Sequence, residues 1–464
     1  MMGERWAPRL RLPARASVAY LTAGVVTKAV GIISGAVFTR LISAAEYGEF
    51  SLYMTLLALL SGTVTGFCPQ GTVYRLYKEG DNVRDITASV LRLELCVLAS
   101  VYLLLFTFNR LLKLSRLMIF ILCLQLLSDV LLGAYLTERR YLYSFGRVLF
   151  LLLTPAVCAP CLALLLLRLG LSGALSRALG LAVLSLSVLP PALGLLPRAV
   201  ASRGQTGRLL KLSLPMLPST LSVALSAQLD RIVISLLMGK DALGRYSVVH
   251  SIALGLSFAV GALGSALFPW LTRRLANRDA KRARELCDEL LFLFSAATVF
   301  IIALIPEGML ILAPKAYSVA LPAALPLAIS TLPYFISSVN SSLLGGVRGG
   351  GAASAATVTG SLSGVLLALL LIPPLGYYGA GLAALLGSLL SASLSLYLGK
   401  RRHGIMLFSP LRSALLLSAT LLYGGILSLL YDYAPLRILL LIPPAILAIS
   451  RLLGVYGALR ERTA

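Results

Sequence analysis

Charged side chains inside long apolar runs are the residues of this sequence whose types could do chemistry. Lys28 lies midway in "AGVVTKAVGII", Asp129 lies in "LQLLSDVLLG", and Asp230 and Arg231 are adjacent in "SAQLDRIVIS". A charge within an apolar membrane helix costs several kcal/mol unless it faces water or a partner. These residues therefore predict a water-filled cavity in which cations bind anionic groups and carboxylates bind cations.

Each of these charges also has a purely structural interpretation. Arg231 lies near the predicted outer end of its helix, where a long side chain can reach the membrane interface instead of a cavity. Asp230 points about 100° away from Arg231 around a helix, so it is expected to need a different partner. Asp129 is either a cation partner or a structural hydrogen-bonding group, and the sequence leaves both open. Lys28 is the deepest of the four and favours the cavity.

The candidate cavity residues include polar uncharged companions. The full set is Lys28, Asp230, Arg231, Asp129, Gln228, Gln125 and Asn340. No catalytic residue is predicted, and without a phosphate-binding P-loop no built-in ATPase is expected. The two histidines, His250 and His403, are far apart in the sequence, so neither a metal site nor a cofactor is expected. "CAPC" at 158–161 has redox-motif spacing, but it lies in an apolar run and is interpreted as small residues on a proline-kinked helix.

The elements that must position these residues are membrane-spanning helices. The chain has 464 residues, 58% of them hydrophobic and 13% charged, with a mean hydropathy of +0.90. Apolar runs of about twenty residues recur throughout, which predicts an all-α polytopic membrane protein with about fourteen transmembrane helices. The expected spans are 16–39, 50–71, 91–109, 117–136, 148–167, 174–196, 211–238, 246–270, 290–312, 322–344, 354–373, 378–398, 411–430 and 436–456. The basic N-terminus is followed by a run of over twenty residues without a clear cleavage site, and it is interpreted as a retained first helix.

The net charge of +23 is spread over the short gaps between the apolar runs. No gap is long enough to hold a basic nucleic-acid-binding domain, so nucleic acid is not an expected partner. About 29 of the 41 Lys and Arg residues lie in alternate gaps on the side of the N-terminus, against about ten on the other side. The positive-inside rule therefore predicts that both termini are cytoplasmic.

Internal similarity divides the chain into two halves. "LISAAEYGEF" (41–50) resembles "LMGKDALGRY" (237–246), "VLLGAY" (130–135) resembles "SLLGGV" (342–347), and "LGLSGA" (169–174) resembles "LGYYGA" (375–380). These matches predict two six-helix bundles related by a pseudo-twofold axis along the membrane normal, with a substrate site between them. The predicted parts are a cytoplasmic N-terminus (1–15), a first bundle (16–196), a cytoplasmic linker (197–210), a second bundle (211–400), and two extra helices with a cytoplasmic tail (401–464).

Several of these stretches resemble a known family. "LLKLSLPMLPSTLSVALSAQLDRIVISLLMGKDALGRYSVVHSIA" (209–253), "ALFPWLTRR" (266–274), "IPPLGYYGAGLAALLGS" (372–388) and "TKAVGIISGAVFTRLISAAEYGEFSLY" (27–53) are similar to bacterial oligosaccharide flippases of the polysaccharide-biosynthesis (Wzx-like) family. This family belongs to the multidrug/oligosaccharidyl-lipid/polysaccharide exporter (MOP) superfamily. The resemblance covers about residues 16–400, and the last two helices resemble those of the fourteen-helix members.

The resemblance implies an alternating-access flippase that moves an undecaprenyl-diphosphate-linked oligosaccharide from the inner to the outer leaflet. Lys28 stands where relatives often place a basic residue, which suits a diphosphate. The implied partners are the lipid-linked oligosaccharide, the bilayer of a bacterial inner membrane and a coupling cation, either a proton or sodium, and a monomer is expected.

Two alternative substrates stay open. A lipid II flippase is the first, although "VGIISGA" lacks the second arginine often found in such proteins. A drug/cation antiporter of the same superfamily is the second, and it would use buried acids as its main cavity charges. A membrane polymerase or ligase acting on the same glycolipid is less favoured because every loop here is short.

Overall fold

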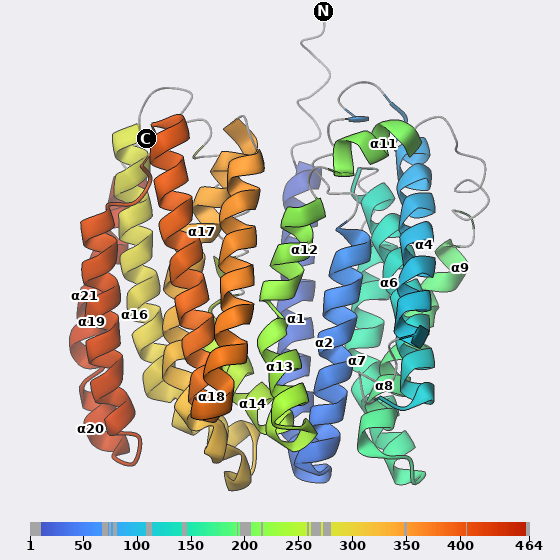
Figure 1. Cartoon of the computed structure of the whole chain (residues 1–464), viewed down its shortest axis with the longest axis horizontal. Coiled ribbons are helices and arrows are strands. Elements are labelled where there is room, and N and C mark those ends of the chain that lie inside the picture. Colours follow the sequence, from blue (N-terminus) through green and yellow to red (C-terminus); the bar gives the residue numbers. More distant parts are fainter. Residues whose placement is uncertain are drawn as a thin grey trace, which may run out of the picture. The chain divides into compact units, whose positions relative to one another are not determined.

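The computed structural model describes most of the chain as helices (Figure 1). The described residues are 11–66, 73, 76–77, 81–107, 114–141, 146–192, 194, 206–214, 217–257, 259–260, 271, 280–347, 350–404 and 406–460. No β-strand occurs within these ranges. The predicted all-α polytopic class is therefore confirmed.

The contacts divide the chain into two compact units, Met1–Ala224 and Leu225–Ala464. The first unit holds α1 (Arg11–Leu41), α2 (Ala44–Thr65), α4 (Val83–Thr107), α6 (Arg116–Tyr141), α7 (Gly146–Arg168), α8 (Gly173–Ser185), η2 (Leu186–Val188), α9 (Leu189–Ala192), α11 (Thr206–Ser213) and most of α12 (Leu217–Ser226). The second unit holds α13 (Leu229–Leu237), α14 (Lys240–Ala253), α16 (Ala280–Leu312), η4 (Lys315–Ala323), α17 (Ala324–Val347), α18 (Gly350–His403), α19 (Pro410–Leu429), α20 (Ala434–Leu439) and α21 (Ile442–Arg460).

Ten of the described helices are long and apolar enough to cross a membrane, and the bent pair formed by α12 and α13 makes an eleventh. The predicted count of about fourteen is not confirmed. The eighth predicted helix, 246–270, lies partly outside the described residues. It begins within α14 (Lys240–Ala253), which has 14 residues and spans about 21 Å, less than the hydrocarbon core of about 30 Å.

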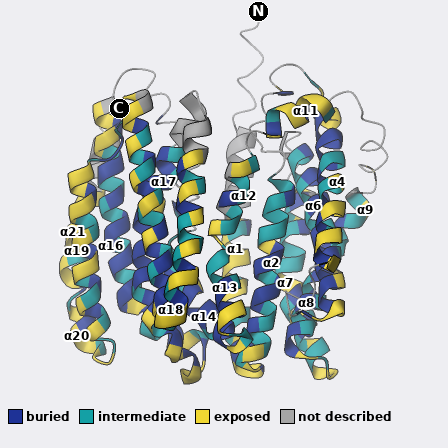
Figure 2. Cartoon of the chain, in the orientation of Figure 1, coloured by how far each residue is buried: buried dark blue, intermediate teal, exposed yellow. Residues whose placement is uncertain are grey.

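Large apolar side chains cover the outward surface of the helices. Figure 2 shows exposed residues in long stretches along α19, α20 and α21, and they include Leu411, Leu422, Leu429 and Ile446. In water so large an apolar surface would be unfavourable, but lipid tails are as apolar as leucine. The exposed surface is therefore suited to a bilayer.

α18 is a hairpin of two antiparallel legs, although its 54 residues are continuous. Gly376 breaks the helix with φ 56° and ψ −129°, a left-handed conformation that glycine adopts without a Cβ penalty. A Cβ added at Gly360 would meet Ser391, and a Cβ added at Gly364 would meet the Cα of Gly387 at 3.8 Å. From Gly360 to Gly364 the first leg advances by four residues, while the facing residue of the second leg goes back by four, from Ser391 to Gly387, so the legs are antiparallel. The two spans predicted at 354–373 and 378–398 are these legs.

The hairpin α1–α2 and the hairpin α13–α14 have matching bounds. Their first helices end at Leu41 and Leu237, and the N-cap residues of their second helices are Ser43 and Gly239, each 196 positions apart. The caps differ in chemistry, since Ser43 forms a capping box with Glu46 while Gly239 turns the chain with φ 90°. The similarity between 41–50 and 237–246 thus reflects the same local fold twice.

The helix predicted over 211–238 is not one continuous helix. α11 ends at Ser213 and α12 begins at Leu217, and residues 215–216 between them lie outside the described part of the chain. The helix is interrupted before α13, where the Gln228 N–H bonds the Leu225 carbonyl, three residues back, at 3.0 Å. There the Ser226 hydroxyl contacts Ser361 of α18, and this contact ties the bend to the second unit.

The division between the units falls within this same predicted helix. α12 packs on α2 of the first unit. A Cβ added at Gly62 would lie 3.5 Å from the Ala224 Cβ, and a Cβ added at Gly66 would lie 3.3 Å from the Thr220 Cβ. Of the linker predicted at 197–210 from internal similarity, residues 197–205 lie outside the described residues and 206–210 belong to α11. The boundary stays a prediction.

Candidate functional site

The seven predicted cavity residues lie on four helices and one bend. Lys28 is exposed, midway along α1, Gln125 and Asp129 lie on α6, and Asn340 is buried on α17. Gln228 is the N-cap residue of α13, and Asp230 and Arg231 lie in its first turn. Two groups are brought into contact within the units: Gln125 with Asp129, and Asp230 with Arg231 through a third residue that the sequence did not single out.

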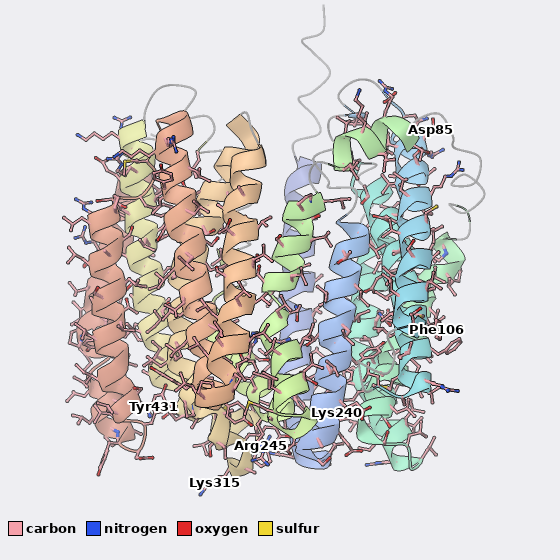
Figure 3. All side chains as sticks on the ribbon, viewed as in Figure 1. Asp85, Phe106, Lys240, Arg245, Lys315 and Tyr431 are labelled. Carbon is pink, nitrogen blue, oxygen red and sulfur yellow. The ribbon has the colours of Figure 1, made fainter. Side chains whose placement is uncertain are left out.

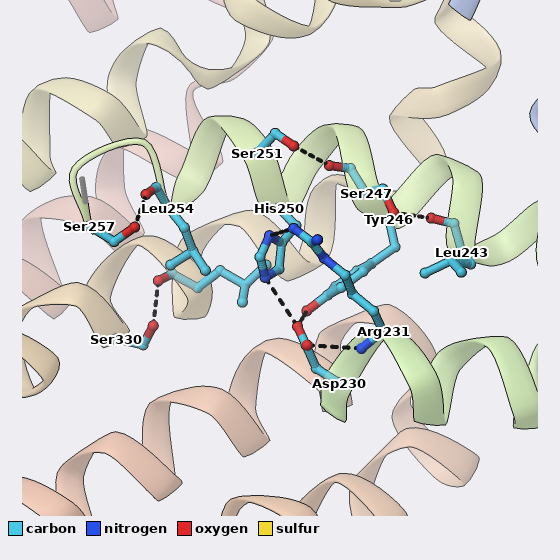
Figure 4. Close-up of polar contacts among 11 residues, drawn as sticks. Asp230, Arg231, Leu243, Tyr246, Ser247, His250, Ser251, Leu254, Ser257 and Ser330 are labelled. Atoms are coloured by element: carbon cyan, nitrogen blue, oxygen red, sulfur yellow. Dashed lines mark hydrogen bonds and ion pairs between the residues drawn. The ribbon is translucent and has the colours of Figure 1, made fainter. Parts of the chain in front are cut away.

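That third residue is His250 on α14 (Figure 4). Asp230 Oδ2 lies 3.3 Å from His250 Nε2 and accepts a hydrogen bond of 2.6 Å from the Tyr246 hydroxyl. On the other side of the ring, Arg231 Nη2 lies 2.6 Å from His250 Nδ1. The His250 ring thus lies between a carboxylate and a guanidinium, and we call these four residues the Asp230–His250 cluster.

The cluster is largely buried. The side chain of His250 is 9% exposed and that of Asp230 is 14% exposed. The backbone N–H of Arg231 donates to Asp230 Oδ1 at 2.8 Å, and an acid in the first turn of a helix is stabilised by the helix dipole. Asp230 thus has both oxygens bonded, which is what a buried carboxylate requires.

The contacts define the protonation state of His250. An arginine in a protein keeps its proton and can only donate, so Nδ1 must accept. The ring proton then resides on Nε2, where it faces Asp230. His250 is therefore neutral in this arrangement, and the cluster carries one positive and one negative charge.

A second polar group lies inside the first unit. Gln125 Nε2 donates to Asp129 Oδ1 at 3.2 Å, and Ser185 of α8 donates to Gln125 Oε1 at 2.7 Å. No Lys or Arg among the described residues forms an ion pair with Asp129, so the contacts seen are those of a group that joins α6 and α8.

An apolar cavity of about 410 Å³ lies in the second unit, apart from both polar groups. It is bounded by α16, α17, the second leg of α18 and α19, and Lys400 is the single charged residue of its lining. None of the seven candidates lines it.

Three basic residues of the second unit lie at a common end of its helices (Figure 3): Lys240, Arg245 and Lys315. They are among the basic residues counted on the outer side of the membrane.

The sequence carries a signal for His250 in its distance from the turn of its hairpin. A helical hairpin turning at Gly239–Lys240 places residues equally far before and after the turn at the same height. Asp230 and His250 lie ten positions on either side of residue 240. The predicted hairpin "LMGKDALGRY" was therefore sufficient to pair the unpartnered aspartate with this histidine.

A fold with ten or eleven helices long and apolar enough to cross a membrane, counted over the described residues, is that of a multi-pass membrane protein. The profile of the polysaccharide biosynthesis protein family matches residues 14–274, more than half of the chain. The chain belongs to this family, as its resemblance predicted. None of the curated proteins matches it in sequence.

Solved structures establish the fold of the MOP superfamily. The inward closed conformation of the lipid II flippase MurJ superimposes with a TM-score of 0.64 at 15% identity, covering 93% of this chain and 98% of that chain. An inward-facing multidrug resistance MATE family transporter of the MOP superfamily gives 0.65 at 14% identity, covering 84% and 95%. A MOP superfamily transporter from Pyrococcus furiosus, described with a binding pocket of reverse polarity, gives 0.56 at 14% identity with the same coverage.

Proposed function

We propose that this protein is an alternating-access flippase that moves an undecaprenyl-diphosphate-linked oligosaccharide from the inner to the outer leaflet for surface polysaccharide synthesis. The observation that carries the proposal is membership of the polysaccharide biosynthesis protein family. The MOP fold supports it, since transporters of this fold include a flippase of a lipid-linked sugar. The chain acts as a transporter and not as an enzyme in this proposal.

Lys28 is the proposed ligand of the diphosphate. It lies midway in α1 and its side chain is exposed at the protein surface. An ammonium group within a span is retained where it meets an anion or water, and a diphosphate supplies two strongly anionic groups. In this proposal Asp230, Arg231, Asp129, Gln228, Gln125 and Asn340 also contribute to substrate or ion binding.

The proposed setting is a bacterial inner membrane with both termini in the cytoplasm. The distribution of Lys and Arg over alternate gaps supports this orientation. A monomer driven by a proton or sodium gradient accounts for transport without a nucleotide site.

The alternative with a specific observation in its favour is a lipid II flippase. The MurJ structure matches 93% of this chain and 98% of its own length. A drug/cation antiporter is supported by the MATE structures. The three candidates differ in cargo, so transport assays with each cargo distinguish them.

Replacement of Lys28 by alanine tests the proposal. We expect Lys28→Ala to abolish export of the oligosaccharide without lowering the amount of folded protein in the membrane, while Lys28→Arg keeps the charge and a substantial part of the export. In a deletion strain, lipid-linked oligosaccharide should accumulate in the inner leaflet, and its surface-exposed fraction, measured with an impermeant glycosidase, reports rescue by each variant. Full export by Lys28→Ala would exclude the proposed role, and rescue of lipid II but not of oligosaccharide transport would establish the alternative cargo.

A further inference from the structure

The Asp230–His250 cluster has a second arrangement that differs by one proton. A proton taken up by neutral His250 must bind Nδ1, because Nε2 already carries one. Nδ1 is the atom that accepts from Arg231 at 2.6 Å. The added N–H would place two donors and two positive charges against each other, so the contact between Arg231 and His250 must break.

The contact with Asp230 is strengthened by the same step. His250 Nε2, which carries the ring proton, lies 3.3 Å from Asp230 Oδ2. A positively charged ring would form an ion pair with this carboxylate. Asp230 therefore exchanges one positive neighbour for another. Proton uptake at His250 Nδ1 therefore requires displacement of the Arg231 guanidinium, and the two changes occur together.

Two buried atoms show that the neutral arrangement leaves hydrogen-bonding capacity unused. Arg231 Nε and the side-chain oxygen Oε1 of Gln228 are both buried without a hydrogen-bond partner among the described residues. A buried polar atom without a partner is rare and calls for a cause. Gln228 lies three residues before Arg231, so its Oε1 is an unused acceptor to which the displaced guanidinium can donate.

No further charge interferes with this exchange in the described part of the surrounding helices. α13, α16, η4 and α17 pack against α14, and the charged groups that act on His250 are Asp230 and Arg231, both from α13. The Tyr246 ring lies 5.5 Å from the His250 ring. On α16, Glu307 pairs with Arg437 instead, and on α14, Arg245 pairs with Asp241.

The equivalent hairpin of the first half has no such cluster. At the offset of 196 positions, Asp230, Arg231, Tyr246 and His250 correspond to Ser34, Gly35, Phe50 and Met54. The same local fold therefore forms from uncharged residues. Since packing the hairpin does not need these charges, and a charge inside a span is costly, the cluster in the second half calls for a functional explanation.

We propose that His250 is a proton-binding site in which one proton is exchanged for the Arg231 guanidinium, and that this exchange couples proton movement to transport. The proton comes from hydronium and forms the Nδ1–H bond, leaving water, while Arg231 keeps all its protons. The coupling role rests on the proposed transport function, whereas the proton site does not depend on any cargo.

The proton site can be tested without transport because the chain has only two histidines. His403→Gln leaves His250 as the single histidine, and side-chain ¹⁵N NMR of this variant in lipid nanodiscs reads its tautomer. We expect the Nε2–H tautomer at high pH and a doubly protonated ring at low pH, within a range of about pH 5 to 8. An Nδ1–H tautomer, or a ring that stays neutral throughout this range, would overturn the proton site.

The coupling role is tested in proteoliposomes with an imposed pH gradient. We expect His250→Gln to reduce the transport of labelled undecaprenyl-diphosphate oligosaccharide driven by the pH gradient by about tenfold, and His403→Gln to leave the response to the gradient intact. Size-exclusion chromatography confirms that His250→Gln is folded. An unchanged response in His250→Gln would refute coupling.

Failure of the proposed cargo has a different signature. If the NMR titration is as expected and the gradient drives lipid II or a drug instead of the oligosaccharide, the proton site and its coupling stand and the proposed cargo is wrong. A gradient of sodium that drives transport in the absence of a pH gradient would overturn the coupling role.

Discussion

Asp230 and Arg231 are consecutive in the chain, yet each reaches His250 at a different ring nitrogen. The two side chains diverge around α13, so only a residue of another helix can be held between them. α14 provides that residue because its hairpin with α13 turns at Gly239. The result is a cluster in which the protonation state of one ring depends on an acid and a base that are neighbours in sequence.

The two charges of this cluster should differ in their tolerance to substitution. Asp230→Asn removes the negative charge of the Asp230–His250 cluster and leaves the positive charge of Arg231 without a counter-charge. Arg231→Lys keeps a cation that can still donate to His250. We expect Asp230→Asn to impair oligosaccharide export more strongly, by roughly tenfold or more, since an uncompensated charge in a span costs about 2.5–3.5 kcal/mol. Export normalised to folded protein in the membrane measures both variants, and the reverse order would identify Arg231 as the more important member.

At the residue scale, the sequence predicted half of this arrangement. The angle between successive helical residues showed that Asp230 needs a partner other than Arg231, and the structure supplies His250 and Tyr246. The partner was missed because histidines were considered only as metal ligands, which need other ligands nearby. The equal distance of Asp230 and His250 from the turn of the hairpin, and not their residue types, indicates that they are partners.

The α18 hairpin shows how glycines set the distance between two helices. A Cβ added at Gly387 would lie 2.9 Å from the Gly364 Cα and 3.3 Å from the Gly360 carbonyl oxygen. The two legs therefore approach each other backbone to backbone, as small residues allow in membranes. Separation of the legs would also displace Ser361, whose contact with Ser226 accompanies the bend before α13.

Gly387→Ala should destabilise the protein even though alanine favours helices. The clash with the opposite leg costs about 1–3 kcal/mol, which exceeds the helix-propensity gain of about 1 kcal/mol. Gly425→Ala of α19 is the matched control, because a Cβ there has no neighbour within 4 Å, and it should be neutral or stabilising. Thermal unfolding in detergent distinguishes the two, and equal melting temperatures would contradict the close packing of the legs.

At the element scale, hydropathy predicted where most helices lie but not how they are interrupted. The legs of α18 were predicted as two separate apolar spans, 354–373 and 378–398. The break before α13 was not predicted, because neither glycine nor proline occurs in "SAQLD". At this break Ser226 contacts Ser361, which is 135 residues away in the sequence. Local sequence cannot report such a contact.

The C-terminal helices are joined to α16 by two ion pairs along its length. The Arg437 guanidinium, which is 1% exposed, pairs with Glu307, and its Nη1 donates to the Tyr431 carbonyl at 2.7 Å. Arg451 pairs with Glu289 at 2.9 Å, but its side chain is 58% exposed. Only the first of these pairs is held within the protein.

The two arginines should therefore contribute unequally to stability. Removing one partner of a buried ion pair costs about 3–5 kcal/mol, with the lower end expected here because Glu307 is partly exposed, whereas an exposed pair contributes about 0–1 kcal/mol. We expect Arg437→Ala to lower the melting temperature clearly and Arg451→Ala to leave it almost unchanged. Equal effects of the two substitutions would show that the Arg437 pair is not a stabilising contact.

At the scale of the molecule, composition alone predicted the membrane class and the superfamily resemblance predicted the fold. Both follow from averages over many residues, which tolerate local exceptions. The pairing of Arg437 with Glu307 is such an exception, since it joins residues that are 130 positions apart. Arg437 is among the basic residues counted on the outer side, and such a count gives no sign that its side chain is buried.

The pair between Glu307 and Arg437 also sets an order of events during synthesis. Glu307 leaves the ribosome 130 residues before its partner, and at roughly 5–20 residues per second the interval is on the order of ten seconds. During that interval α16 has entered the membrane with an acid near its end and without the cation that will cover it. The nascent chain must therefore keep this end of α16 in contact with water or with the insertion machinery until α20 arrives. A ribosome that stops before Arg437 would release a protein in which Glu307 of α16 lacks its cationic partner.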